Sequence, residues 1–364
     1  MDFVFYNPTK IISGKDVVLK NRELFKNFGK KAMIVTGRKS AKMNGSLSDV
    51  IQALAANGIN YVIFDQIMSN PTIDIVYLGA KLARENGVDF IIAIGGGSPM
   101  DAAKAIAMLA VSNVDQKDLF SGNYKGALPM VFIPTTSGTG SEVTQYAILT
   151  NDEVETKTTV ASPIMFPLLA LLDGKYTMGL SKSTTINTTI DALSHAIESY
   201  LSKKASPISR MYAVEAIKLI SNHFSNLINY DLTLEARNSL LYASTIAGIC
   251  ISLTGTTAVH TMGYSLTYFK EIDHGRANGL LLGEYLLVLK KRNVKEICNI
   301  EDALGMSIEE FNFILNKLIG EKEKVTLDEI KLYASKAMLQ KNTKNSIIDL
   351  TLVDLISIMS KVFL

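Results

Sequence analysis

Two residues with metal-binding side chains stand four positions apart in the segment 191-DALSHAIESY-200. On a helix, Asp191 and His195 would lie on one face, one turn apart, where a carboxylate oxygen and an imidazole nitrogen can hold the same cation. The Ala, Leu and Ile residues around them are of the types that fill protein cores. The segment therefore predicts a helix that directs two ligands to one buried cation.

Two more of the four histidines follow in segments with few charges. His260 occurs in the small-residue, apolar run GTTAVHTMGYSL, and His274 occurs in IDHGRANGLLL. Taken singly, a histidine is more often a core or loop residue than a ligand. Together, three imidazoles and one carboxylate form a suitable donor set for Fe²⁺ or Zn²⁺. His223 has polar neighbours, and we expect it at the surface.

The elements that must position these side chains change in type along the chain. Up to about residue 180, apolar runs typical of strands alternate with helical patterns, and from about residue 181 only helical patterns remain. Alternating strands and helices predict a parallel sheet that is covered on both faces. The predicted strands are 32–36, 60–64, 89–94 and 129–135, and the predicted helices between them are 47–57, 75–87 and 98–111.

Composition limits the class of protein. A chain of 364 residues favours two domains, and its net charge of +2 gives no general attraction to nucleic acid or anionic membranes. Two cysteines cannot build a disulfide framework, and this usage fits a reducing cytosol. No apolar run has the length of a membrane span, and the first residues lack the pattern of a signal peptide. We expect a cytoplasmic α/β protein without a nucleic-acid or membrane partner.

A glycine-rich loop, 94-IGGGSPMDAAKA-105, follows one predicted strand and opens a helix. Gly96 and Gly97 let the backbone approach a bulky group, and free N–H groups behind them attract anions. Ser98 can cap the helix, with Asp101 three residues later near the positive end of its dipole. The loop is neither GxGxxG nor a P-loop nor a nucleophile elbow. A pyrophosphate site and a tight strand-to-helix turn both fit it.

A second loop, 134-PTTSGTGSEVT-144, is rich in hydroxyl groups. Thr135, Thr136 and Thr139 could surround a ribose or a nicotinamide amide. A solvent-exposed turn would have a similar composition, so both interpretations stay open on this loop alone.

The end of the first predicted strand bears on the choice of cofactor. Dinucleotide-binding folds that prefer NAD place an acidic residue there, which repels a 2′-phosphate. This chain has Gly37 and Ser40 instead, with cations at Arg38, Lys39 and Lys42. That set favours NADP over NAD, and an ordinary basic surface loop is the alternative.

In their order, spacing and residue identities, these motifs resemble those of the iron-containing alcohol dehydrogenase family. The opening segment 5-FYNPTKIISGK-15 is also similar, and the resemblance extends to about position 285. It implies an α/β N-terminal dinucleotide-binding domain with a parallel sheet, expected at 1–180, and an all-α C-terminal metal-binding and substrate domain, expected at 181–364. It also implies a metal site in the cleft between them and a homodimer.

The resemblance assigns roles to particular positions of this chain. The implied metal ligands are Asp191, His195, His260 and His274. Together with the residues of the basic loop, the expected cofactor-binding set is Gly37, Lys39, Ser40, Asn70, Gly96, Gly97, Ser98, Asp101, Thr135, Thr136, Thr139 and Lys157.

One position departs from the family's pattern. Many members carry a histidine one turn after the ligand that corresponds to His260, and this chain has Tyr264 there. Tyr264, a ribose hydroxyl or water could move the proton, so we assign no catalytic acid.

The expected activity is a metal-dependent alcohol dehydrogenase or aldehyde reductase. It would pass a hydride between NADP(H), or NAD(H), and a small alcohol, aldehyde or diol, with Fe²⁺ bound and Zn²⁺ as the alternative metal. A polyol oxidoreductase of the glycerol dehydrogenase type is a second hypothesis. A non-redox lyase of the dehydroquinate synthase type is a third, and the Asp-His-His-His set argues against it. A non-catalytic binding protein would not need four metal ligands beside a dinucleotide site.

Overall fold

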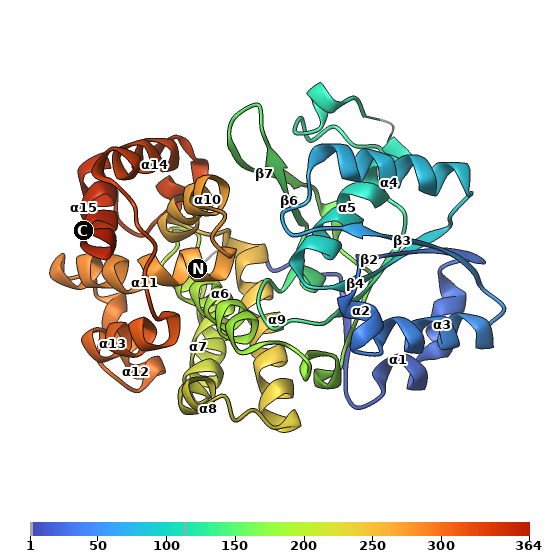
Figure 1. Ribbon diagram of the computed structural model, residues 1–364, viewed down its shortest axis with the longest axis horizontal. Coiled ribbons are helices and arrows are strands. Elements are labelled where there is room, and N and C mark those ends of the chain that lie inside the picture. Colours follow the sequence, from blue (N-terminus) through green and yellow to red (C-terminus); the bar gives the residue numbers. More distant parts are fainter. Residues whose placement is uncertain (1–2, 113) are drawn as a thin grey trace. The chain divides into compact units, whose positions relative to one another are not determined.

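The computed structural model describes residues 3–112 and 114–364 (Figure 1). Its contacts divide the chain into two compact units. The first, here called the α/β unit, runs from Asn7 to Leu180. The second, here called the helical unit, runs from Ser181 to Leu364 and includes residues 3–6 near the N-terminus.

The α/β unit is built on a six-stranded parallel sheet with the order β1-β8-β5-β4-β2-β3. The four predicted strands are confirmed as β2, β3, β4 and β5, whereas β1, β8 and the antiparallel hairpin β6–β7 were not predicted. The bounds are β1 Lys10–Ser13, β2 Lys31–Gly37, β3 Asn60–Ile67, β4 Phe90–Gly95, β5 Met130–Pro134, β6 Tyr146–Asn151, β7 Thr156–Ala161 and β8 Leu169–Leu172.

The central strands β2, β4 and β5 are buried on both faces, which explains why they are almost continuously apolar. Met33 and Ile91 point to the face that packs against α4 (Ile73–Glu85) and α5 (Gly97–Ser112). Alternate strand residues on the opposite face pack against α1 and α3, and Figure 1 shows the two pairs of helices on opposite sides of the sheet. The short helices and α3 on that side have the bounds α1 Val17–Lys20, α2 Ser40–Met43 and α3 Ser46–Ala56.

The carboxyl ends of the central strands bring three of the sequence motifs together. Gly95 at the end of β4 pairs with Pro134 at the end of β5, and Thr36 near the end of β2 pairs with Ile94. The chain passes from β2 to β3 on one side and places β4 on the other, so the strand order reverses between β2 and β4. In open parallel sheets, ligands bind outside the carboxyl ends at such a reversal.

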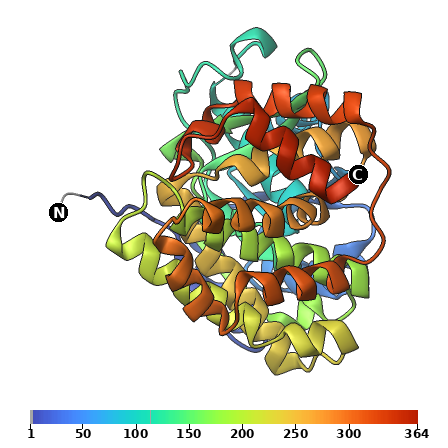
Figure 2. The same cartoon turned by 90° about the vertical axis from the view of Figure 1, so that its left-hand side faces the viewer.

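The helical unit begins at α6, and in its described residues the only strand-like pairing is an isolated bridge between Ser202 and Ser346. Several helices start after a Ser or Thr whose side chain accepts a hydrogen bond from the first turn, among them α6 with Ser181 and α9 with Thr233. Figure 2 shows the last two helices side by side. The bounds are α6 Lys182–Tyr200, α7 Pro207–Ser221, α8 Phe224–Asn229, α9 Leu234–Thr254, α10 Ala258–Lys270, α11 His274–Lys291, α12 Glu296–Leu304, α13 Ile308–Ile319, α14 Leu327–Leu339 and α15 Leu352–Phe363.

A search of the described residues for membrane-spanning helices finds no single helix of sufficient length and apolar character. The pair α9 and α10 passes that test jointly, by length and composition only, and is bent by 108° at its break.

Candidate active site

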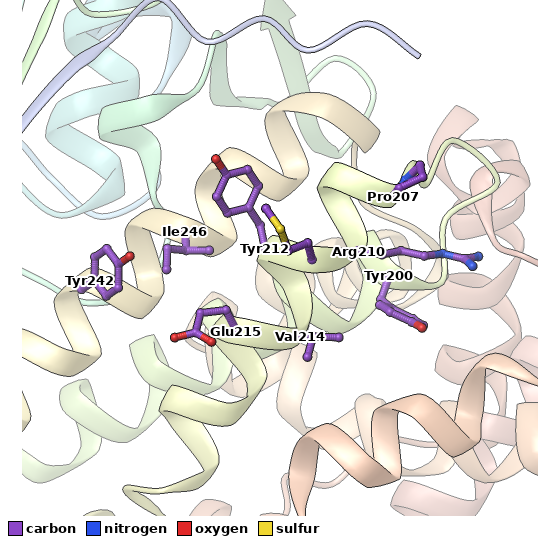
Figure 3. Close-up of a pocket in the computed structure, with 9 residues that line it drawn as sticks. Tyr200, Pro207, Arg210, Tyr212, Val214, Glu215, Tyr242 and Ile246 are labelled. Carbon is purple, nitrogen blue, oxygen red and sulfur yellow. The ribbon is translucent and has the colours of Figure 1, made fainter. Parts of the chain in front are cut away.

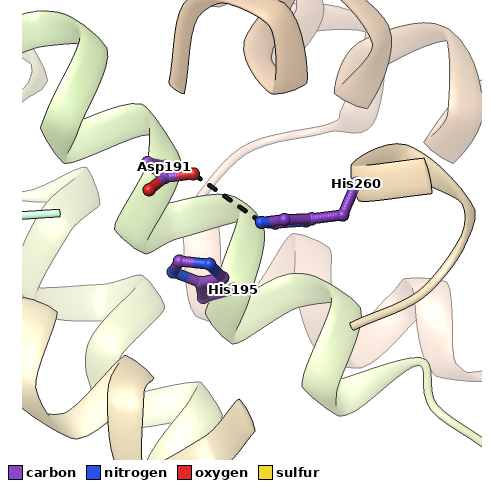
Figure 4. Close-up of side chains that lie close together, drawn as sticks. All are labelled: Asp191, His195 and His260. Carbon is purple, nitrogen blue, oxygen red and sulfur yellow. Dashed lines mark ion pairs between the residues drawn. The ribbon is translucent and has the colours of Figure 1, made fainter. Parts of the chain in front are cut away.

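Three of the four expected metal ligands meet inside the helical unit. Asp191 and His195 lie one turn apart on α6, and His260 lies in the first turn of α10 (Figure 4). Their side chains each offer one ligand atom, and these atoms all lie within 4.8 Å of one another. All three residues are buried, with at most 5% of their surface exposed. The spacing of four residues on α6 thus directs both side chains to one point.

The distances in this cluster are close to those of ligands that share an ion. His260 Nε2 lies 3.7 Å from Asp191 Oδ1, and the His195 and His260 rings stack with centroids 4.6 Å apart. Metal–ligand bonds of about 2.0–2.2 Å in a tetrahedron place neighbouring ligand atoms about 3.3–3.6 Å apart. A buried carboxylate with two imidazoles at this spacing fits a divalent cation such as Fe²⁺ or Zn²⁺.

His274, the fourth expected ligand, lies beside these three as the first residue of α11. Its Nε2 atom is 3.9 Å from Asp191 Oδ1, and its ring centroid is 5.2 Å from that of His260. Gly275 allows this approach, because a Cβ there would lie 1.9 Å from the backbone oxygen of Asn187 on α6. The absence of a side chain at Gly275 therefore lets α11 bring His274 to Asp191.

The same cluster contains Asn278, which the sequence analysis did not identify. Its amide Nδ2 atom lies 2.9 Å from Asp191 Oδ1, 3.1 Å from His260 Nε2 and 3.3 Å from His274 Nε2. Asn278 is fully buried one turn after His274 on α11. The four-residue step that revealed Asp191 and His195 would also have revealed this pair.

Glu198 is the second residue that the sequence analysis missed. This fully buried carboxylate accepts hydrogen bonds from the Thr257 backbone N–H at 2.8 Å and the Thr257 hydroxyl at 2.6 Å, and it contacts His260 Nδ1. Burial alone would raise the pKa of Glu198, but His260 and the Thr257 donors outweigh it and hold this pKa below its usual value. Nearby, burial raises the pKa of the Tyr285 hydroxyl to about 12, so that group stays neutral.

Tyr264, where many members of the resembled family carry histidine, packs directly on the cluster. Its ring is stacked on that of His274, with centroids 5.4 Å apart and an angle of 18° between the planes. It also forms a T-shaped pair with the His260 ring, at a centroid distance of 6.4 Å and an angle of 83° between the planes. Because of this stacking, the buried Tyr264 ring covers one face of the His274 ring.

In the α/β unit, the glycine loop and the hydroxyl loop pack against each other. A Cβ on Gly96 would lie 2.8 Å from Thr136 Oγ1, and a Cβ on Gly97 would lie 2.6 Å from Thr139 Cγ2. The bulky neighbours that require these glycines include the threonines themselves. Thr135, the first residue after β5, donates its N–H to the backbone oxygen of the last residue of β4.

The expected cap of α5 is wrong in detail. The helix starts at Gly97, so Ser98 lies within its first turn. The Ser98 hydroxyl instead accepts a hydrogen bond from the backbone N–H of Asn70 at 3.3 Å. Asn70 itself has a positive φ of 58° and lies in the loop that precedes α4. This contact brings Asn70 to the glycine loop.

Asp101 and Lys104 form a buried polar cluster behind the two loops. Lys104 Nζ donates to Ser141 Oγ at 2.7 Å and Thr144 Oγ1 at 2.9 Å, and it lies 3.7 Å from Asp101 Oδ1. Asp101 accepts hydrogen bonds from the Ser141 hydroxyl and from the backbone N–H of Ile148. Burial lowers the pKa of Lys104 to about 8, against the opposing effect of Asp101. Asp101 thus ties α5 to the hydroxyl loop and the β6–β7 hairpin.

The basic loop after β2 lies beside an acidic residue of β3, Asp65, which the sequence analysis did not consider. Lys42 Nζ lies 2.8 Å from Asp65 Oδ2 on β3, so this cation is paired. Gly37 ends β2, and Lys39 and Ser40 follow it, with Ser40 as the first residue of α2. The remaining expected cofactor residue is Lys157 of β7, which lies opposite Thr150 of β6 in the hairpin and is buried.

A groove of about 570 Å³ lies elsewhere on the helical unit (Figure 3). None of its lining residues is one of the four expected ligands. They come from α6, α7 and α9, and they are Tyr200, Pro207, Arg210, Met211, Tyr212, Val214, Glu215, Tyr242 and Ile246.

A parallel dinucleotide-type sheet with glycine and hydroxyl loops at its carboxyl edge, together with a helical unit holding a buried Asp-His-His cluster, is the combination found in metal-dependent dehydrogenases. The sequence matches the family described as iron-containing alcohol dehydrogenase over residues 8–174, and the C-terminal part of that family over residues 185–363. The chain therefore belongs to the iron-containing alcohol dehydrogenase family.

Individual relatives support this assignment. A long-chain primary alcohol dehydrogenase of Thermoanaerobacter ethanolicus is 36% identical over 71% of this chain and 66% of that relative. A 1,3-propanediol dehydrogenase of Citrobacter freundii is 32% identical over 76% of this chain and 72% of that relative. The crystal structure of an iron-containing alcohol dehydrogenase from Thermotoga maritima is 38% identical, with a TM-score of 0.93 over 100% of this chain and 99% of the other.

Proposed function

We propose that the protein is a metal-dependent alcohol dehydrogenase that transfers a hydride between NADP(H) and a small primary alcohol, terminal diol or the corresponding aldehyde. The observation that carries this proposal is the buried cluster of Asp191, His195 and His260, whose ligand atoms lie within 4.8 Å of one another. The choice of primary alcohols and terminal diols follows the relatives that are named for long-chain primary alcohols and for 1,3-propanediol, whereas the small size of the substrate is the expectation from the sequence.

The proposed ligands are Asp191, His195, His260 and His274. A cation held by them would act as a Lewis acid on the alcohol or aldehyde oxygen, and a bound nicotinamide would give or take the hydride. Two further side chains would support the proposed ligands. Asn278 donates to the Asp191 carboxylate and orients it, and Tyr264 shields one face of the His274 ring.

The proposed cofactor site combines Gly96, Gly97 and Ser98 for the pyrophosphate with Thr135, Thr136 and Thr139 near the nicotinamide. Asn70, Asp101 and Lys157 would support it, and Gly37, Lys39 and Ser40 would meet the adenosine ribose. The reversal of strand order between β2 and β4 supports this position for a dinucleotide.

The activity is tested directly at 340 nm, by NADPH oxidation with a panel of short and long aldehydes and glycerol-derived carbonyls, and by NADP⁺ reduction with terminal diols. We expect turnover that requires Fe²⁺ or Zn²⁺ and is lost after chelation. Metal-independent turnover, or none with any aldehyde in a metal-loaded protein, would contradict the proposal.

The preference for NADP(H) rests on the charge at the end of β2, where Arg38 and Lys39 add two cations beside Lys42, which pairs with Asp65. One or two charge-assisted hydrogen bonds to a 2′-phosphate, each worth about 1.5–3 kcal/mol, would give roughly a tenfold or greater preference. We expect Gly37→Asp to damage NADPH use by like-charge repulsion and to spare or improve NADH use. Steady-state kcat/KM with each cofactor measures this change.

Gly37→Ala is the matched control, because it adds a Cβ without a charge. That Cβ would lie 3.3 Å from the backbone oxygen of Ile67, which requires only a small adjustment. We expect the alanine variant to keep the preference of the wild type. Equal kcat/KM for both cofactors in the wild type, unchanged by the aspartate, would refute the NADP assignment.

We further propose that the enzyme is a cytoplasmic homodimer, as the family resemblance implies. Sedimentation analysis of the metal-loaded protein tests the oligomeric state, and a monomer at micromolar concentration would contradict it.

A further inference from the structure

The ring of His260 lies between two groups of opposite hydrogen-bonding character. On one side, the Glu198 carboxylate contacts Nδ1, and an ionised carboxylate can only accept hydrogen bonds. On the other side, the amide Nδ2 of Asn278 lies 3.1 Å from Nε2, and an amide nitrogen can only donate. A neutral imidazole satisfies both neighbours in one tautomer alone, with the proton on Nδ1 and the lone pair on Nε2.

The orientation of the Asn278 amide is itself determined by a second contact. Its nitrogen lies 2.9 Å from Asp191 Oδ1, so the reversed orientation would bring the amide oxygen against a carboxylate oxygen. The donor on the Nε2 side of His260 is therefore set by Asp191. The two sides of the ring independently lead to the same tautomer.

Glu198 is equally constrained at its other oxygen. Oε1 accepts hydrogen bonds from the backbone N–H of Thr257 at 2.8 Å, the Thr257 hydroxyl at 2.6 Å and the backbone N–H of His260 at 3.3 Å. These donors belong to the start of α10, so one carboxylate oxygen caps that helix while the other holds the imidazole. The carboxylate is fully buried, and its position is set by the same turn that carries His260.

We propose that Glu198 is a positioning residue of the metal centre, which keeps the proton of His260 on Nδ1 and thereby leaves Nε2 free to bind the cation. This inference rests on the proposed metal site. Carboxylate groups behind metal-binding histidines typically change metal affinity 10–100-fold when they are replaced.

Glu198→Gln separates this role from that of a helix cap. The introduced amide oxygen can still accept from Thr257 and the His260 backbone, whereas its NH2 group must then face Nδ1 of His260. Because that NH2 group only donates, Nδ1 has to accept and the proton moves to Nε2, where it blocks the cation. We expect a roughly 10–100-fold weaker affinity of the apo-protein for Zn²⁺, measured by competition with a chelator, at nearly unchanged helix content.

The tautomer can be observed directly. With only four histidines in the chain, selective ¹⁵N-histidine labelling gives few signals, and their loss in a His260→Ala variant assigns those of His260. In the metal-free wild type at a pH where the ring is neutral, we expect a protonated Nδ1 and an unprotonated Nε2. We expect the reverse in Glu198→Gln. Glu215→Gln, an exposed glutamate on α7, is the control and should change neither quantity.

Each outcome is decisive. The role of Glu198 is overturned if the wild type binds Zn²⁺ but its His260, in the metal-free protein, is protonated on Nε2. This outcome decides the question even if the glutamine variant does not fold. Equal Zn²⁺ affinity of wild type and Glu198→Gln also overturns it, while the metal site itself stands. A wild type that binds no divalent cation overturns the proposed function and this inference together.

Discussion

Replacement of His274 by alanine is expected to lower kcat/KM by about 10³-fold and to reduce the amount of bound metal. Loss of Lewis-acid stabilisation worth about 4 kcal/mol corresponds to that factor. His274 is the best ligand to remove, because its side chain is 23% exposed and its loss leaves no buried carboxylate without a partner. Steady-state kinetics and metal analysis of the purified variant measure both effects.

His223→Ala provides the control for this experiment. His223 precedes α8 and lies 3.4 Å from Asn226 through Nδ1, outside the ligand cluster. We expect wild-type activity and metal content in this variant. Full activity and full metal content in His274→Ala would show that the ligand assignment is wrong.

Lys104→Met is expected to destabilise the α/β unit by about 3–5 kcal/mol. The substitution keeps the volume of the side chain but removes a fully buried cation next to the carboxylate of Asp101, whose side chain is only 13% exposed. Breaking a buried ion pair on one side has a cost of this size. It also leaves the Ser141 and Thr144 hydroxyls without their shared donor. A fall in melting temperature on the order of 10 °C should follow.

Two further variants test the cause of this loss. Lys81→Met removes an exposed lysine that lies 3.8 Å from Glu85, and surface pairs of this kind contribute about 0–1 kcal/mol. Adding Asp101→Asn to Lys104→Met removes the unpaired charge, so the double variant should recover part of the lost stability. Identical melting temperatures for Lys104→Met and Lys81→Met would contradict a structural role of the buried lysine.

The central part of the fold could be predicted because both sheet faces are buried. Strands β2, β4 and β5 are apolar over most of their length, and the helices between the strands are long enough to show a period. Strand β3 is a largely exposed edge strand, but it contains the apolar run Tyr61 to Phe64. Strands β1 and β8 have only four residues each, too few for any period, and most of β1 is exposed. The β6–β7 hairpin is rich in threonine and resembles a polar loop in sequence.

The ligand cluster could be predicted because its residues are rare and regularly spaced. The residues behind it were missed for a different reason. Glu198, Asn278 and Lys104 are of common types, and their burial depends on contacts with distant segments, such as Thr257 for Glu198. A charged or amide residue within an otherwise apolar helical stretch was the available signal. The pairing of Lys42 with Asp65 likewise depends on the neighbouring strand.

The close packing at Gly275 has a consequence for how this chain can evolve. Every amino acid that replaces glycine adds a Cβ, and at this position that atom would meet the Asn187 backbone at 1.9 Å and the Asp191 Cβ at 2.9 Å. A change of rotamer cannot relieve contacts of this kind. We therefore expect every single substitution at position 275 to disturb the packing of α11 on α6. Descendants of this sequence are therefore confined to glycine at position 275 for as long as α11 packs on α6 at this point.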